Sequence, residues 1–225
     1  VSSGTAAVSV ALASAGVGAG DEVIMPAFTF VASFEAIMML GAIPVLVHID
    51  TTSTLDPKAV AKAITPKTKA IMLAHALGNP FNLKKVVELC KKYNLWLIED
   101  TCDALGAEYD GQKCGTFGDI GTLSFYPAHH MTMGEGGAVF MNNPELKAIA
   151  ESFRDWGRDC YCETGCDNTC NKRFDWKLGD LPQGYDHKYI YSHIGFNLKV
   201  TDTQAAIGLS QLSKADTFVQ KRREN

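Results

Sequence analysis

Short apolar runs with the composition of buried strands alternate with longer segments of helical spacing along most of this chain. Such runs are short and rich in branched and aromatic residues, and turn signals bound them. They occupy residues 21–26, 43–50, 68–75, 95–100, 121–125 and 137–141. Alternation of strand and helix predicts strand–helix–strand units around a mostly parallel sheet. We therefore expect an α/β fold with a mixed, mostly parallel sheet flanked by helices.

The segments between the runs carry helix start and stop signals. One helix is expected over residues 33–40, before Gly41, and another behind the capping Asp56 and Pro57. Further helical patterns cover residues 83–93 and 144–153, and another begins at Thr201 or Asp202. These helices have the right lengths to connect parallel strands.

The regular pattern stops beyond Trp156. Residues 158–198 form a cysteine-rich and aromatic stretch without helix or strand periodicity. Long irregular segments inside a compact domain are usually functional or disordered, and the aromatic content here favours function.

Length, hydrophobic content and charge limit the possible classes of protein. With 225 residues, 46% of them hydrophobic, the chain can bury a substantial core. A net charge of −4 with interspersed signs leaves no basic face, so we expect no nucleic-acid partner. No apolar run approaches the roughly 18 residues of a membrane span, so we expect no membrane partner.

The chain begins at Val1, not at a methionine, and it stops inside a helical pattern. We therefore expect both natural ends to lie beyond it. The expected organisation is a large domain over residues 1–215 whose N-terminal part is missing. Residues 216–225 are then the start of a helix that leads to a mostly absent small C-terminal domain.

Seven cysteines are distributed unevenly. Cys90, Cys102 and Cys114 are scattered, whereas the other four are bunched at 160, 162, 166 and 170. An odd count in a chain with an ample core argues against a disulfide framework and favours metal or cluster ligation by the bunched group. The rest of the sequence has a cytoplasmic character.

Small and hydroxylated residues open the chain and lead directly into a helix. Unpaired backbone N–H groups at a helix N-terminus attract anions, so Gly4, Thr5 and Ala6 could hold a phosphate. The alternative is an ordinary capped helix.

Two carboxylates, Glu99 and Asp100, end the strand predicted at 95–100. Open α/β sheets place their ligands at the carboxyl ends of parallel strands. A carboxylate there could pair with a protonated ring nitrogen, as pyridoxal phosphate enzymes require. The alternative is a solvated strand end.

Taken in order, these segments resemble the DegT/DnrJ/StrS family of sugar aminotransferases. The similarity covers nearly the whole chain and includes "SSGTAA", "LIEDTCDALGA" and "GTFGDIGTLSFYPAHHMTMGEGGAVF". It implies the large domain of the aspartate aminotransferase type (fold type I) with pyridoxal or pyridoxamine phosphate as cofactor. By resemblance, Gly4, Thr5, Ala6 and Ser124 hold the cofactor phosphate, Phe30 stacks on its ring and Asp100 pairs with its nitrogen. Asn197 reaches a phosphate of the neighbouring subunit, which implies a homodimer.

A histidine occupies the position where this family carries its Schiff-base lysine. The sixth residue of "SFYPAH" is His129, and an imidazole cannot hold the cofactor covalently. Pyridoxamine phosphate bound without a covalent link remains possible, with a base of pKa near ~6.5 that removes a proton from the cofactor carbon. His130 is the rival candidate for this base, and an inactive, degenerate enzyme is the alternative.

The cysteine spacing resembles the iron–sulfur dehydrase branch of the same family. Cys102, Cys160, Cys162 and Cys170 are separated by 57, one and seven residues. Four thiolates are the usual ligands of a 2Fe–2S cluster, although zinc suits such a set equally. Asp100 and Cys102 would lie about 7 Å apart in extended geometry, which would put the cluster beside the cofactor ring. We expect Cys166 to be a bystander.

The resemblance implies loss of the carbon 3 hydroxyl from a CDP-4-keto-6-deoxy sugar in bacterial 3,6-dideoxysugar biosynthesis. Electrons would come through the 2Fe–2S cluster from an NADH-dependent iron–sulfur flavoprotein reductase. Two alternatives stay open: a cluster-free dehydratase that uses an amino donor and whose thiols bind zinc or nothing, and a non-catalytic cofactor-binding protein. Asp103 stands where the family commonly has glutamine, and it could contact the ring hydroxyl or tune the cluster. His187 and His193 are candidates for contacts with the sugar or nucleotide.

Overall fold

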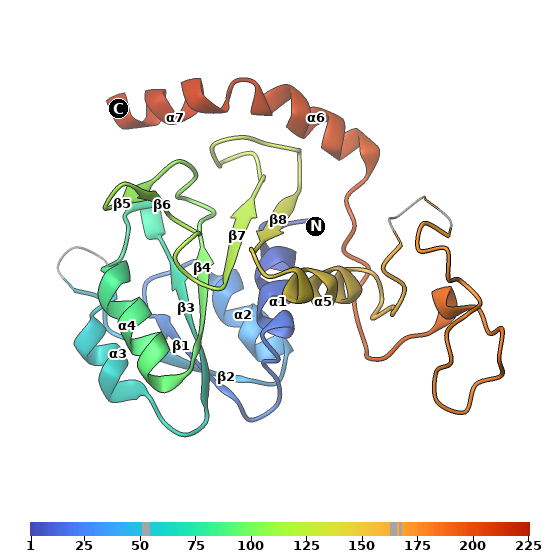
Figure 1. Ribbon diagram of the computed structural model, residues 1–225. Helices are drawn as coiled ribbons and strands as arrows, with labels where there is room; N and C mark the ends of the chain where they lie inside the picture. The colour runs from blue at the N-terminus through green and yellow to red at the C-terminus, as the bar shows by residue number, and fades with distance from the viewer. Residues whose placement is uncertain (51–54, 163–165, 167) are drawn as a thin grey trace.

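A six-stranded sheet forms the centre of the computed structural model, which describes residues 1–50, 55–162, 166 and 168–225 (Figure 1). The order of the strands is β2-β1-β3-β4-β7-β8. All neighbouring pairs are parallel except β7 and β8, which run antiparallel. The strands span Glu22–Pro26 (β1), Ile43–Val47 (β2), Thr68–Ala74 (β3), Trp96–Asp100 (β4), Ile120–Ser124 (β7) and Gly137–Phe140 (β8). The predicted mixed, mostly parallel sheet is confirmed.

The helices begin at residues that can cap them. The Asp56 side chain accepts a hydrogen bond from the amide of Lys58, and Thr201 forms a capping box with Gln204. The helices are Gly4–Ser14 (α1), Val31–Met39 (α2), Pro57–Ala63 (α3), Leu83–Tyr93 (α4), Pro144–Arg154 (α5), Asp202–Leu212 (α6) and Ala215–Glu224 (α7). Wherever the sequence predicts the first or last residue of a helix, the observed residue lies within two positions of it.

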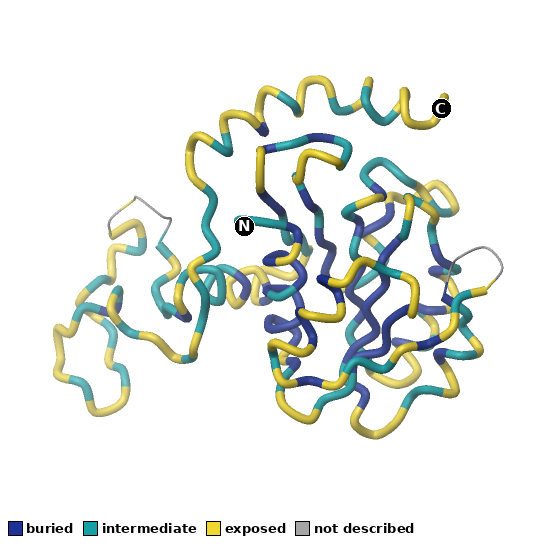
Figure 2. Tube along the Cα trace, turned by 180° about the vertical axis from the view of Figure 1, so that it is seen from behind, coloured by how far each residue is buried: buried dark blue, intermediate teal, exposed yellow. Residues whose placement is uncertain are grey.

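Alternate residues of the central strands pack on opposite faces of the sheet, since successive strand side chains point to opposite sides. Val23 and Met25 join the core with α1, α2 and α5, whereas Ile24 joins the core with α3 and α4. Figure 2 shows the buried sheet and α1 beneath more exposed loops. Helices cover both faces of the sheet, so its ligand-binding edge lies at the carboxyl ends of the strands.

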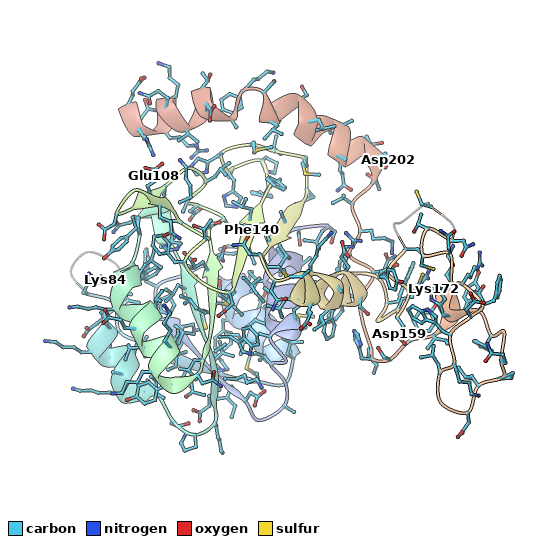
Figure 3. The ribbon with its side chains drawn as sticks, viewed as in Figure 1. Lys84, Glu108, Phe140, Asp159, Lys172 and Asp202 are labelled. Atoms are coloured by element: carbon cyan, nitrogen blue, oxygen red, sulfur yellow. The ribbon has the colours of Figure 1, made fainter. Side chains whose placement is uncertain are left out.

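Two parts of the chain lie outside this layered body. Helices α6 and α7 arch over the edge where the strands end, and the described residues of 158–198 form a separate lobe beyond α5 (Figures 1 and 3). Within that lobe the only helical turn among the described residues is η2 (His187–Tyr189). Short strands β5 (Glu108–Tyr109) and β6 (Gln112–Lys113) form a hairpin. It was not predicted, because strands of two residues are too short to show a periodic pattern in the sequence. In the described part of the chain, no helix is both long and apolar enough to cross a bilayer.

Candidate active site

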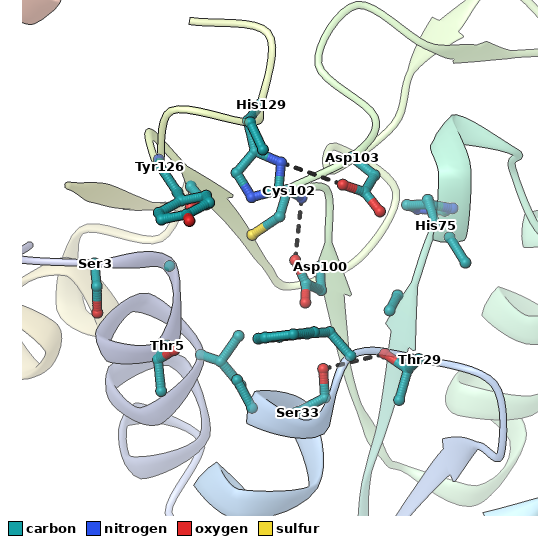
Figure 4. A pocket seen from close by; sticks show the side chains of 18 of the residues that line it. Ser3, Thr5, Thr29, Ser33, His75, Asp100, Cys102, Asp103, Tyr126 and His129 are labelled. Carbon is teal, nitrogen blue, oxygen red and sulfur yellow. Dashed lines mark hydrogen bonds and ion pairs between the residues drawn. The ribbon is translucent and has the colours of Figure 1, made fainter. Parts of the chain in front are cut away.

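A cavity of about 570 Å³ opens at the carboxyl ends of the parallel strands. Its walls come from the start of α1, the turn between β1 and α2, the end of β4 and the loop after β7. Figure 4 shows these side chains turned toward one space. The residues proposed from the sequence as cofactor, catalytic or metal-binding groups that line it are Gly4, Thr5, Phe30, Asp100, Cys102, Asp103, Ser124 and His129.

The N-terminus of α1 borders the cavity and is built for close approach. Ser3 is the N-cap, and its hydroxyl accepts a hydrogen bond from the amide of Ala6. A Cβ atom on Gly4 would lie 2.5 Å from the Cβ of Ser124 and 3.3 Å from the sulfur of Cys102. Only glycine therefore lets the first turn of α1 meet Ser124. Ala6 does not line the cavity, and Ser3 already uses its N–H group.

Asp100 stands at the end of β4 with its carboxylate in the cavity (Figure 4). Its Oδ1 atom accepts hydrogen bonds from the Cys102 amide at 3.1 Å and from the Thr122 hydroxyl at 3.4 Å. Burial raises the pKa of Asp100, and hydrogen bonds from Cys102 only partly offset this effect. A cationic ring nitrogen placed against this carboxylate would stabilise its ionised form.

Glu99, the other carboxylate of the pair, faces away from the cavity and is fully buried. It accepts hydrogen bonds from the amides of Gly115, Phe117 and Gly118 at 2.7–2.8 Å and from Nε2 of His75 at 3.1 Å. Burial alone would raise the pKa of Glu99, but these hydrogen bonds outweigh it and hold the pKa below its ordinary value. The two adjacent carboxylates therefore differ in role, since Glu99 braces the loop before β7 and Asp100 faces a ligand.

His129 lines the cavity and its Nδ1 atom lies 3.2 Å from Oδ1 of Asp103. The second ring nitrogen, Nε2, is turned toward the cavity (Figure 4). The hydrogen bond with His129 holds the pKa of Asp103 below its usual range despite partial burial. An ionised carboxylate at Nδ1 keeps the proton on that nitrogen and leaves Nε2 free to accept one.

His130 points elsewhere. It lines a second cavity of about 490 Å³ beneath α7, and it is not among the residues around the first. Burial, helped by the charge of Arg222, lowers the pKa of His130. Of the two histidines, only His129 reaches the space in front of Asp100.

Several residues of the cavity were missed from the sequence. Tyr126 stands edge-on to His129 with ring centres 6.2 Å apart, and Thr29 and Ser33 form a hydroxyl pair at 3.2 Å. Thr29 and Tyr126 lie on turns at strand ends and Ser33 lies in the first turn of α2, so their place after a strand is the one signal that could have found them. Phe30, predicted to stack on a ring, has 75% of its surface exposed at the rim of the cavity.

The cysteines do not gather as one set of four. Cys102 lies in the cavity beside Asp100, as expected from their spacing. Cys160, Cys162 and Cys170 lie in the separate lobe, where the thiol of Cys162 exchanges hydrogen bonds with those of the other two. His187 Nε2 approaches the Cys170 sulfur at 3.4 Å.

Over the described residues, no group of three or more potential ligands is arranged to hold a metal ion. Burial raises the pKa of the Cys102 thiol, whereas the pKa of Cys162 falls to about 7 mainly through a hydrogen bond from Thr169. Because Cys102 lies in the cavity and the other three cysteines lie in the lobe, this arrangement does not fit a four-thiolate cluster.

The remaining predicted residues also lie in or near the lobe. Asn197 bridges to Asp155 beyond α5, and its side-chain oxygen accepts a hydrogen bond from Lys199 at 2.8 Å. His187 is buried under Trp176 with ring centres 4.0 Å apart, and His193 packs on Phe153 at 4.3 Å. All three lie outside the lining of the cavity.

The described cavity fits a pyridoxamine phosphate molecule. A close approach that only Gly4 permits, a helix N-terminus and the Ser124 hydroxyl suit a phosphate, and the Asp100 carboxylate suits a ring nitrogen. An exposed aromatic ring at the rim suits stacking. The cavity thus offers a suitable group to the phosphate, the ring nitrogen and the ring face of that cofactor.

The sheet order, the flanking helices and this cavity define the aminotransferase-like class of pyridoxal phosphate proteins, fold type I. The chain belongs to the DegT/DnrJ/EryC1/StrS aminotransferase family, whose family model matches residues 1–225.

Two curated relatives and one solved structure illustrate the similarity. The lipopolysaccharide biosynthesis protein RfbH of Salmonella typhimurium is 62% identical over 207 residues, which cover 92% of this chain and 47% of that protein. The dTDP-4-dehydro-2,6-dideoxy-D-glucose 3-dehydratase of Saccharopolyspora spinosa is 54% identical over 92% of this chain and 45% of its own. The chain therefore spans about half the length of these relatives. The NtdA structure from Bacillus subtilis with bound cofactor PMP is 32% identical, with a TM-score of 0.77 over 95% of this chain and 43% of that chain.

Proposed function

We propose that the whole protein is a pyridoxamine phosphate-dependent enzyme that removes the carbon 3 hydroxyl of a nucleotide-linked 4-keto-6-deoxy sugar. One observation carries this proposal: the side chain that faces Asp100 across the cavity is a histidine, His129, and not a lysine. Its Nδ1 atom lies against Asp103. The names of the two relatives, a lipopolysaccharide biosynthesis protein and a sugar 3-dehydratase, support the same chemistry.

When bound, pyridoxamine phosphate supplies an amine that condenses with a ketone and a ring that stabilises negative charge on the adjacent carbon. Gly4, Thr5 and Ser124 hold its phosphate, and Phe30 covers its ring. Asp100 pairs with the ring nitrogen and keeps it protonated. These contacts replace the covalent link that His129 cannot make.

His129 moves the protons in this scheme. Nδ1 donates to Asp103, so Nε2 is the basic atom that faces the cavity. With the cofactor and sugar bound, Nε2 would accept a proton from the ligand and, as an imidazolium, would donate it to the departing carbon 3 hydroxyl. One side chain thus serves as base and then as acid on the same face of the ligand.

The nucleotide is proposed to be CDP, which rests on the resemblance of the motifs alone. The test uses the full-length protein loaded with pyridoxamine phosphate and CDP-, dTDP- or GDP-linked 4-keto-6-deoxy sugars in D₂O. The expected result is a CDP sugar lighter by one oxygen, detected by mass spectrometry. The hydroxyl leaves as water, and the two electrons come from conversion of pyridoxamine phosphate to pyridoxal phosphate with release of ammonia. No turnover of any of the three sugars would overturn the proposal, and turnover of another sugar alone would overturn only the CDP assignment.

A cluster-free dehydratase is favoured over the iron–sulfur deoxygenase by one observation, the separation of Cys102 from the three cysteines of the lobe. The deoxygenase remains the proposal that the cysteine spacing supports, together with an NADH-dependent reductase partner. Iron and acid-labile sulfide analysis of protein purified without air separates the two. Two irons and two sulfides per chain would establish the cluster, and their absence would leave the cluster-free enzyme.

We also propose that the enzyme is a homodimer, with Asn197 directed to the partner subunit's cofactor phosphate. Large apolar side chains are exposed at α2 and the preceding turn, and such a patch on a folded protein usually marks an interface. The most exposed are Phe30, Val31, Met38 and Met39, at 51–76%. Light scattering of the full-length protein should give twice the mass of one chain.

A further inference from the structure

The loop that carries His129 is fixed at its base by its own hydrogen bonds. Between β7 and β8 the amide of Met133 and the hydroxyl of Thr132 both donate to the carbonyl of Phe125, at 3.0 and 3.1 Å. The amide of His129 donates to the carbonyl of Tyr126 at 3.0 Å. These bonds close the loop locally but do not tie its tip to the rest of the molecule.

The arch of α6 and α7 supplies contacts from outside (Figure 1). At α6, Gln204 donates to the carbonyl of Glu135 at 3.0 Å, and Gly208 lies against Met133. At α7, Nη2 of Arg222 donates to two consecutive carbonyls, those of Ala128 at 3.0 Å and His129 at 2.9 Å. The arch therefore contacts both the return of the loop and its tip.

His129 is consequently held at two points. Asp103 binds its ring at Nδ1, and Arg222 binds its main chain. These two carbonyls belong to the two peptide planes that meet at the Cα of His129, so a guanidinium that donates to both restrains the main chain on each side of that atom. The direction of the His129 side chain depends on these two planes.

We propose that Arg222 is a positioning residue that sets the placement of His129 in the cavity. This inference rests on the proposed function. It also links α7 to the chemistry, because Arg222 joins this helix to the main chain of the proposed base. Misplacement of a reacting group by about 1 Å can reduce the rate roughly a hundred-fold.

Arg223 provides a matched control within the same helix. Its Nη2 donates to the carbonyl of Gly106 at 2.7 Å, so it attaches α7 to the other side of the second cavity. Arg222→Ala and Arg223→Ala each remove one exposed guanidinium that binds the main chain. Only the first loses contact with the loop of His129.

The experiment measures the placement of the side chain at position 129 in the full-length protein by the rate of its reaction with pyridoxal phosphate. His129→Lys provides a primary amine that can bond to the aldehyde of pyridoxal phosphate, with release of water, and the bond is followed by absorbance and borohydride trapping. Adding Arg222→Ala should slow this bond formation at least ten-fold, whereas adding Arg223→Ala should leave it within two-fold. Arg222→Lys, which keeps a donor, should restore part of the rate.

In the parent protein, Arg222→Ala should lower kcat about ten- to a hundred-fold with KM little changed. Equal effects of Arg222→Ala and Arg223→Ala, or no effect of Arg222→Ala in either assay with Tm preserved, would overturn the inference. Failure of the proposed function would appear differently, as no dehydration by the parent protein.

Discussion

Asp103 and His129 form the hydrogen-bonded pair that defines the chemistry of this cavity, with Oδ1 and Nδ1 3.2 Å apart. Asp103 follows β4 and His129 follows β7, so two neighbouring strand ends bring them together. The pair directs the free nitrogen of the imidazole toward Asp100 and the cofactor position. In the proposed function, this pair supplies a proton-transfer group in place of a covalent anchor.

Replacing the base should restore the covalent anchor. We expect His129→Lys to form a borohydride-reducible bond with pyridoxal phosphate and to lose dehydration by about 10²- to 10⁴-fold, the usual contribution of a positioned base. Absorbance and the mass of the reduced protein measure the bond. His130→Lys is the control, because its side chain lies at the second cavity and should form no bond. Full dehydration by His129→Lys would contradict the assignment.

Asp103→Asn should separate orientation from binding. An asparagine can still occupy the space, but its amide no longer secures the proton on Nδ1. We expect kcat to fall roughly ten- to a hundred-fold, part of the 10²- to 10⁴-fold that a base contributes, with KM and cofactor affinity nearly unchanged. Steady-state kinetics and cofactor titration provide the measurement. A large loss of cofactor affinity with kcat preserved would instead indicate that Asp103 contacts the ring.

Gly4→Ala should weaken cofactor binding. The new Cβ would lie 2.5 Å from the Cβ of Ser124, so the helix start or the serine must move. Overpacking costs about 1–3 kcal/mol, and a tenfold change in dissociation constant corresponds to about 1.4 kcal/mol. We therefore expect the dissociation constant of pyridoxamine phosphate to rise about ten-fold by calorimetry. Gly18→Ala, with no atom within 4 Å of the new carbon, should bind as the parent does.

Acid should destabilise the fold through Glu99. Its pKa is lower in the folded chain than the ordinary 4.5, so its contribution to the free energy of unfolding is complete above that pH. The contribution is lost as pH falls from 4.5 through the folded pKa, because the unfolded chain binds the proton first. Urea unfolding between about pH 3 and 7 should show this decline.

Glu99→Gln should remove the part of the decline due to this group. At pH 7 it should cost about 1 to 3 kcal/mol, since it removes a buried carboxylate that accepts hydrogen bonds from three amides and from Nε2 of His75. Glu108→Gln is the control, because Glu108 pairs with Lys113 on the exposed hairpin. An unchanged pH profile for Glu99→Gln would show that the buried carboxylate is not responsible.

The succession of strands and helices along the chain was determined by the sequence alone, because apolar periodicity and capping residues act over a few neighbouring positions. The helix over residues 83–93 was predicted at its observed bounds for that reason, and the observed cap of α6, Thr201, is one of the two residues predicted for it. The family motifs also located Gly4, Asp100, Ser124 and His129, which the structure brings to one cavity.

Only the tertiary structure decided which of two adjacent residues faces the ligand. Asp100 and not Glu99, and His129 and not His130, point into the cavity, because the packing of the sheet and of α7 fixes which side of each segment is buried. The pairing of Asp103 with His129, and of Arg222 with the main chain, joins residues 26 and 93 positions apart. Such contacts depend on how whole elements pack, which no local pattern in the sequence specifies.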